Sequence, residues 1–257
     1  MSSNDSMKKT LVVAFSLCIV CSVIVSTAAV LLKPVQEVNK TLDMKRNILA
    51  AAGMLDDSMG VEEQFQQVST RVVDLRTGSF AQDINAAEYD QRSAAKDPAL
   101  SQDLADEKDL AKINRLENYA SVYLVEDGQG GYEKIILPVR GYGLWSTMRG
   151  FIALESDANT VAGLGFYEHG ETPGLGGEID NPRWKNQWSG KQVYRDGEVE
   201  LGLVKGSVDP SSDNAQWQVD GLAGATLTSR GVTNMVHFWL GENGFEPFLN
   251  KLKSGEA

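Results

Sequence analysis

The sequence predicts an α+β protein in which one N-terminal transmembrane helix precedes a domain with a twisted, mainly antiparallel sheet and flanking helices. The segment 10–32 has no charged residue, no proline and no glycine, and it reaches the roughly 20 apolar residues that a membrane-spanning helix needs. From about residue 116, short runs of β-branched and aromatic residues alternate with glycine and aspartate, which is typical of strands and turns. The C-terminal part returns to the helical spacing of apolar residues.

We interpret 10–32 as an uncleaved anchor that follows a short N-terminal segment, 1–9. A signal peptide is the alternative, because Lys8 and Lys9 give a basic start and 26–28 offers a small-residue cleavage site. The apolar core is longer than the roughly 7–15 residues of a signal peptide and continues past that site. The charges beside the span do not decide on which side the domain lies, since long domains are translocated largely regardless of them.

Composition narrows the expected partners. The chain has 35 acidic and 24 basic residues, a net charge of −11, so we expect no nucleic-acid partner and no attraction to anionic lipid. Both cysteines, Cys18 and Cys21, lie in the span on one helix face, either as a metal or redox pair or as small apolar residues. The rest of the chain has no cysteine and therefore no disulfide or cysteine-ligated cluster of its own. No metal site is expected.

The segment 33–115 is predicted to be a stalk and an N-terminal extension. Apolar residues at helical spacing predict a helix over 34–55, and a second, short helix is expected over 61–70. The run "RVVDLRTGSF" at 71–80 favours a strand. The polar stretch 90–115 is interpreted as a helical or loose surface excursion.

The segment 116–257 is predicted to be the folded domain. Four runs, "YASVYLVED", "YEKIILPVR", "GLWSTMRGFIAL" and "VAGLGFYEH", have the composition of strands, and "VELGLVKG" and "QWQVDG" add two shorter ones. Pro182 near the start of "NPRWKNQWSG" favours a short helix. An apolar stripe predicts a helix over 228–240 that ends at Gly241, and "FEPFLNKLK" predicts another.

The hydroxyl-rich loop "DGLAGATLTSRG" lies directly before the first of these C-terminal helices. The free N–H groups and the positive dipole end of a helix N-terminus form an anion site. Gly221 and Gly224 allow the backbone to approach a ligand closely. A helix capped by the hydroxyl of Thr226 or Thr228, with no ligand, is an equally good interpretation.

The stretch "DGLAGAT" resembles the flavinylation motif of FMN-binding domains, in which the final threonine is joined to FMN by a phosphoester bond. The resemblance makes Thr226 the attachment residue and Asp220 the leading acid, and Ala223 departs from the Ser or Thr common at its position. Asp220 either presents the loop to the modifying enzyme or forms a turn before Gly221. The implied FMN contacts in this segment also include Gly224, Ala225 and Thr228.

A second element, "GETPGLGG", accompanies the motif. Pro173 stiffens this loop, and its glycines permit close approach to a flavin ring or form a plain turn between strands. In "GYGLW", Trp145 is either an aromatic side chain beside the ring or a core residue. The resemblance implies flavin contacts by Glu171, Thr172, Gly174, Leu175, Gly176 and Trp145.

Together, the span, "GYGLW", "ETPGLGGE" and "DGLAGAT" are similar over nearly the whole chain to the family of C subunits of the Na⁺-translocating NADH:quinone reductase. The resemblance implies an electron-relay protein on the periplasmic side of a bacterial inner membrane, with the other subunits of the complex as partners and a flavin transferase for maturation. It implies no catalytic residue here, since the FMN carries the redox chemistry. The chain has no G-x-G-x-x-G site for NADH and no iron–sulfur cysteine set, so it is not active alone. The alternatives are the equivalent subunit of the related Rnf complex and a membrane-anchored assembly module without flavin.

Overall fold

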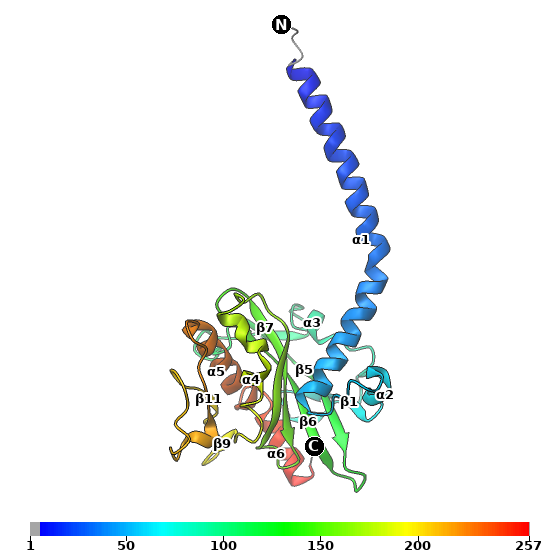
Figure 1. Ribbon diagram of the computed structural model, residues 1–257. Helices are drawn as coiled ribbons and strands as arrows, with labels where there is room; N and C mark the ends of the chain where they lie inside the picture. The colour runs from blue at the N-terminus through cyan, green and yellow to red at the C-terminus, as the bar shows by residue number, and fades with distance from the viewer. Residues whose placement is uncertain (1–5, 257) are drawn as a thin grey trace. The chain divides into compact units, whose positions relative to one another are not determined.

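The computed structural model describes residues 6–256, in two compact units that meet between Asp43 and Met44 (Figure 1). Helix α1, Met7–Ala51, forms the first unit and contributes its last residues to the second. Among the described residues, it is the one helix long and apolar enough to cross a membrane.

The predicted span and most of the predicted stalk fall within α1. The helix passes through Pro34 and ends at Ala51, a few residues before the predicted end at 55. Of the predicted N-terminal segment 1–9, residues 1–5 lie outside the described part of the chain.

The second unit is built around one sheet of six strands, in the order β2-β1-β5-β6-β7-β8. Every neighbouring pair in it is antiparallel, as the sequence predicts. Its strands are β1 (Val68–Asp74), β2 (Ser79–Phe80), β5 (Tyr119–Glu126), β6 (Tyr132–Tyr142), β7 (Thr147–Glu155) and β8 (Val161–Glu168). Three small two-stranded pairs accompany it: β3 (Ser101–Asp103) with β4 (Arg115–Glu117), β9 (Tyr194–Arg195) with β10 (Glu198–Val199), and β11 (Gly202–Leu203) with β12 (Gln218–Val219).

The helices of this unit are mostly short. Pro182 begins α4 because proline is tolerated in a first helical turn, and Asn181 caps that helix. The C-terminal helices end close to the predicted positions. The helical elements are α2 (Val61–Phe65), α3 (Gln91–Ala94), η1 (Gly176–Asp180), α4 (Pro182–Lys185), η2 (Ala215–Trp217), α5 (Thr226–Leu240) and α6 (Glu246–Ser254).

Strand residues alternate between two cores. Val122 and Leu124 of β5 belong to the main core, which also holds the buried faces of α5 and α6. Tyr123 and Val125 belong to a second core, together with Ile48 from the end of α1. Because neighbouring strand residues point to opposite faces, α5 and α6 cover one face of the sheet and the last turns of α1 cover the other (Figure 1).

The predicted division between an extension and a domain at 115/116 is not a division in this structure. Strands β1 and β2 come from the predicted extension, and β1 pairs with β5 along its whole length. The predicted helix over 61–70 ends at Phe65, because "VSTRVVD" pairs with β5 as strand β1 instead. The stretch 90–115 is mostly exposed and contains the four-residue helix α3, as predicted, but it also contributes β3, which pairs with β4.

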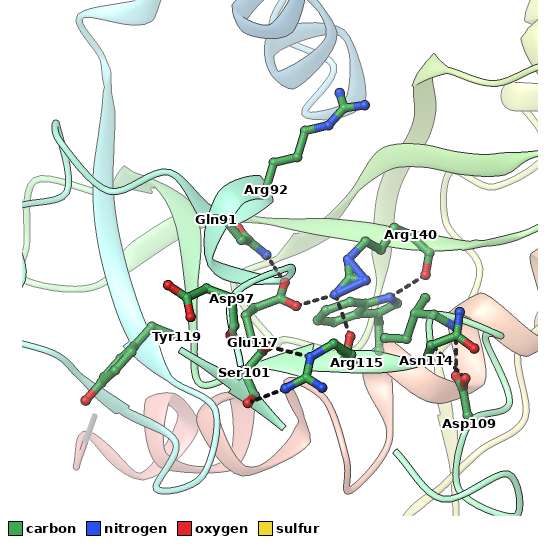
Figure 2. A network of polar contacts seen from close by, with 12 residues as sticks. Gln91, Arg92, Asp97, Ser101, Asp109, Asn114, Arg115, Glu117, Tyr119 and Arg140 are labelled. Carbon is green, nitrogen blue, oxygen red and sulfur yellow. Dashed lines mark hydrogen bonds and ion pairs between the residues drawn. The ribbon is translucent and has the colours of Figure 1, made fainter. Parts of the chain in front are cut away.

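A buried ion pair anchors this stretch to the sheet (Figure 2). The Glu117 carboxylate is fully buried, and it accepts hydrogen bonds from the Arg140 guanidinium and, at 2.6 Å, from the amide of Gln91. The same guanidinium also donates to the carbonyl oxygen of Arg115 and lies over the ring of Trp239 in α5. Strand β6, the stretch 91–117 and α5 are therefore joined through one charge pair.

The turn before β4 supports the end of β6. The buried Asp109 carboxylate accepts the backbone N–H groups of Ile113 and Asn114 at 2.8 and 2.7 Å (Figure 2). Within this turn, the carbonyl oxygen of Ala111 accepts the N–H of Tyr142 at 2.8 Å. The last residue of β6 is thus hydrogen-bonded to a segment that sequence patterns assign to the surface.

Truncating Ile48 tests the second core. The side chain is 0% exposed, so we expect Ile48→Ala to lower the free energy of unfolding by about 2–5 kcal/mol. The full chain in detergent is unfolded with urea and followed by tryptophan fluorescence. Met59→Ala, at a side chain that is 42% exposed, is the control and should change the free energy far less. Equal effects would show that the end of α1 is not part of the folded core.

Removing Glu117 tests the buried ion pair. We expect Glu117→Ala to destabilise the second unit by about 3–5 kcal/mol, because the Arg140 charge stays buried without its partner. Asp103→Ala removes the exposed partner of Arg115 and should cost at most about 1 kcal/mol. Urea unfolding of the two variants side by side checks the difference, and similar losses would contradict the assignment.

Candidate functional site

Helix α5 begins at Thr226 with no side-chain cap. Its N-cap residue is Ala225, which carries no hydrogen-bonding side chain, so the N–H groups of the first turn point outward from an uncapped end. Both threonines proposed from the sequence as caps, Thr226 and Thr228, lie inside the helix instead. The interpretation as a capped helix is therefore wrong, and the positive end of the α5 dipole is open to an anion.

The three hydroxyl groups of the first turn have different surroundings. The Thr228 hydroxyl is fully buried and donates to the Glu171 carboxylate at 2.5 Å. The Ser229 hydroxyl oxygen is also buried and accepts the N–H of Leu222 at 3.0 Å. Thr226 is exposed, and its hydroxyl has no hydrogen-bond partner among the described residues. It is the one of the three that a reactant from solution can reach.

The loop before α5 meets the "GETPGLGG" loop. Gly224 has a φ of +72°, which is favourable for glycine alone, and a Cβ at this position would lie 3.1 Å from the Cδ2 atom of Leu175. The two elements that the sequence analysis singles out are thus in contact. Leu175 is 44% exposed and forms part of the surface beside Thr226.

The carboxylate of Glu171 joins this loop to the tip of the β6–β7 hairpin. It accepts the backbone N–H groups of Leu144 at 3.1 and 3.2 Å and of Trp145 at 3.0 Å, besides the Thr228 hydroxyl. A Cβ on Gly143 or Gly176 would lie 2.5 or 2.8 Å from the carboxylate oxygens, so neither position has room for a side chain. Glu171 is therefore enclosed by backbone on two sides.

These hydrogen bonds keep Glu171 ionised. Burial alone would raise the pKa of its carboxyl group, but the hydrogen bonds from the Thr228 hydroxyl and from the N–H groups of Trp145 and Leu144 outweigh burial. The pKa therefore lies below its ordinary value of 4.5. A negative charge is thus fixed beside the first turn of α5.

Exposed apolar side chains lie on the three segments that meet at the start of α5, which are the β6–β7 tip, the Gly-rich loop and the first turn of the helix. Trp145 is 65% exposed, which excludes the core-packing alternative considered from the sequence. Leu227, the residue after Thr226, is also exposed. We call this group the apolar rim, and its members are Tyr142, Leu144, Trp145, Leu175 and Leu227.

Asp220 has a structural position in this site. Its carboxylate accepts the N–H of Val208 at 2.7 Å and the side-chain amide of Gln187 at 3.1 Å. The indole N–H of Trp184 donates to its carbonyl oxygen at 2.9 Å. Asp220 therefore holds the loop before α5 against two other segments, which is more than the simple turn before Gly221 considered from the sequence.

The other predicted site residues divide by exposure. Two hydrogen bonds fix the ends of the Gly-rich loop. The His169 ring pairs with the Asp180 carboxylate at 2.7 Å, and the hydroxyl of Ser146 accepts the N–H of Gly170 at 2.6 Å. The exposed members of the predicted set are Trp145, Thr172, Gly174, Leu175, Gly224 and Thr226, and the buried ones are Glu171, Gly176, Ala225 and Thr228.

Sequence reasoning missed Leu144, Leu227 and the two serines, Ser146 and Ser229. Leu227 had a usable signal, since it is an apolar residue outside the buried stripe of α5. The roles of the serines and of the Leu144 N–H depend on tertiary contacts and leave no local pattern.

Comparison with known proteins places this site in a family. The sequence model described as "FMN-binding domain" matches residues 143–241, from the hairpin tip to the end of α5. The C subunit of the Na⁺-translocating NADH-quinone reductase of Pseudomonas aeruginosa is 53% identical over the full length of both chains. The chain belongs to this family of C subunits. The Vibrio vulnificus member is 51% identical and covers 99% of each chain.

Solved structures agree with this fold. The crystal structure of Shewanella oneidensis NqrC superposes with a TM-score of 0.77 at 37% identity, over 84% of this chain and 99% of that one. The C subunit from Parabacteroides distasonis gives a TM-score of 0.65 at 29% identity, over 85% and 96%. The fold and family that the sequence predicts are confirmed.

The low pKa of Glu171 predicts a pH-dependent stability. A carboxyl group whose pKa is lowered by folding stabilises the protein above its unfolded pKa, and this stabilisation is lost as the pH falls through the folded pKa. We expect wild type to unfold at higher urea than Glu171→Gln at pH 7 and the difference to shrink below about pH 4.5. Glu133→Gln, at an exposed position, corrects for removing one carboxylate. A difference that stays constant between pH 7 and pH 3 would contradict the assignment.

Proposed function

We propose that this chain carries FMN on Thr226 by a phosphoester bond and relays electrons between redox subunits of a Na⁺-translocating NADH-quinone reductase. In that complex, ubiquinone reduction is coupled to Na⁺ export. The observation that carries the proposal is the exposed, unbonded hydroxyl of Thr226 at the uncapped start of α5. Membership of this family of C subunits supports the assignment to this complex rather than to the Rnf complex.

The site suits a phosphate group. A phosphoester on Thr226 places its negative charge beside the free N–H groups of the first turn of α5 and at the positive end of the helix dipole. Buried neighbours are excluded as acceptors, since the Thr228 and Ser229 hydroxyls are both engaged inside the protein. The geometry thus supports Thr226 as the acceptor over the two other hydroxyl residues of the first turn.

The surface around Thr226 suits the rest of FMN. The apolar rim offers Trp145, Leu175 and Leu227 to a flat, largely apolar ring system, and Gly224 leaves room for close approach of a ligand. Thr172 and Gly174 are exposed on the adjoining loop. When bound, FMN supplies the electron transfer, and the protein supplies position and surroundings.

A separate flavin transferase is needed for attachment, because a threonine hydroxyl is a poor nucleophile without a neighbouring base. The transferase uses FAD and Mg²⁺. The phosphoanhydride bond of FAD breaks, the Oγ1 atom of Thr226 forms a bond to the FMN phosphorus, AMP leaves, and the hydroxyl proton is released. No electron is transferred in this step, so no oxidant or reductant is required.

The anchor fixes the location of the relay. Helix α1 crosses the bacterial inner membrane once, and the second unit lies on the periplasmic side. A covalent bond retains the flavin there in every redox state. The span 10–32 has no acidic residue, so the Na⁺ path belongs to other subunits. Those subunits, the membrane and the flavin transferase are the partners of this chain.

The proposal predicts a specific mass. Intact protein purified from cells that contain the transferase should gain about 438 Da, the mass of FMN less water. Thr226→Val should abolish the gain and the yellow colour, because the acceptor oxygen is lost. Mass spectrometry and the flavin absorbance of the denatured protein measure both.

Thr77→Val is the matched control, since Thr77 is exposed but lies in the turn between β1 and β2. It should keep the full mass gain. No gain in wild type would favour the assembly module without flavin, and a gain in Thr226→Val would place FMN on another residue.

A further inference from the structure

Glu171 is a buried carboxylate without a counter-charge. Its side chain is 4% exposed among residues 6–256, and none of the ion pairs in that part of the chain includes it. Burying an unpaired charge costs several kcal/mol in general, unless hydrogen bonds compensate for the loss of water. The N–H groups of Leu144 and Trp145 and the hydroxyl of Thr228 supply that compensation.

The carboxylate holds three separate segments together. The Leu144 and Trp145 N–H groups belong to the tip of the β6–β7 hairpin, Glu171 begins the Gly-rich loop, and Thr228 lies in the first turn of α5. The pairing of Glu171 with Thr228 joins residues 57 positions apart in the chain. Its loss would leave the start of α5 without its bond to the other two segments.

The bond to Thr228 also decides the direction of Thr226. Each residue of an α-helix is rotated by about 100° about the helix axis relative to the one before it. Side chains two residues apart are therefore rotated by about 200° and point to nearly opposite sides of the helix. Fixing the Thr228 hydroxyl inward on Glu171 therefore turns Thr226 outward. The exposure of one threonine depends on the burial of the other.

We propose that Glu171 is a positioning residue for FMN attachment, acting through Thr228 to present the Thr226 hydroxyl to the flavin transferase. This inference rests on the proposed function. In this role Glu171 acts through its hydrogen bonds, since its two oxygen atoms are engaged by the donors of Thr228, Leu144 and Trp145.

The test measures attachment rates directly. Apo protein is incubated with purified transferase, FAD and Mg²⁺, and the initial rate of mass gain is followed for wild type and variants. We expect Glu171→Gln and Thr228→Val to lower the rate about tenfold or more, as misplacement of a reacting group does. In Glu171→Gln, an NH₂ group replaces one carboxylate oxygen, and this group cannot accept the hydrogen bond that the Thr228 hydroxyl donates. Thr228→Ser keeps the hydroxyl and should stay within about threefold of wild type.

The double variant separates a shared role from two independent ones. Glu171→Gln with Thr228→Val should be no slower than the slower single variant, because both remove the same bond. Multiplied losses would show that the two residues act separately and would overturn the proposal. Wild-type rates in both single variants would overturn it as well.

A stability control excludes general damage. Val73→Ala removes buried volume in the main core, on a strand that does not contribute to the site. Rates are compared well below each variant's Tm and against the measured loss in Tm. If Val73→Ala slows attachment as much as Glu171→Gln does at a similar Tm loss, the role of Glu171 is only structural and the proposal fails.

The two proposals fail in different ways. If wild type gains no FMN with active transferase, the proposed function fails and the positioning role of Glu171 fails with it. If wild type and Glu171→Gln gain FMN at the same rate on Thr226, the proposed function stands and only the role of Glu171 is overturned.

Discussion

The packing of α5 on β6 is the constraint on which the site depends. The helix lies so close to the strand that a Cβ on Gly231 would come within 2.5 Å of the Tyr142 carbonyl oxygen, and the Trp239 indole N–H donates to the Arg140 carbonyl oxygen at 2.7 Å. With these contacts fixed, the first turn of α5 lies beside the hairpin tip that follows Tyr142. The motif loop, the Gly-rich loop and the tip then meet at one place, although they are distant in sequence.

Two of the buried carboxylates, Glu117 and Glu171, contact this helix or its neighbours, and each is stabilised differently. Glu117 has a full counter-charge in Arg140, and it ties a long excursion to β6 two residues before its end and, through Trp239, to the C-terminal end of α5. Glu171 has only backbone N–H groups and one hydroxyl. The second solution leaves no arginine or lysine of the described residues paired with the carboxylate that lies against the first turn of α5. An arginine there would compete with the helix end for an incoming phosphate, whereas N–H groups already bound to Glu171 do not.

Much of the fold follows from local patterns, and the rest depends on contacts between distant residues. The apolar stripe of α5 is readable because burial on one helix face imposes a period on it. Strands β5 to β8 are readable because runs of β-branched and aromatic residues are separated by glycine and aspartate. The strand predicted over 71–80 overlaps β1, but the first three residues of β1 fall in the predicted helix 61–70, because their strand conformation depends on pairing with β5. Within the site, the motif identifies Thr226, whereas helix spacing alone gives equal weight to a capping role. Only the buried partners of Thr228 and Ser229 separate that threonine from its neighbours.

The exposure of the site explains why FMN would need a covalent bond to stay attached. Non-covalent cofactor sites generally enclose most of the ligand surface, and the buried area provides the affinity. Here Thr226, Trp145 and Leu175 all lie on the surface, so an FMN on Thr226 would bury much less of itself. A phosphoester bond makes retention independent of buried area. The ring is then free to remain near the surface, where a partner's redox group can approach it, as the proposed relay requires.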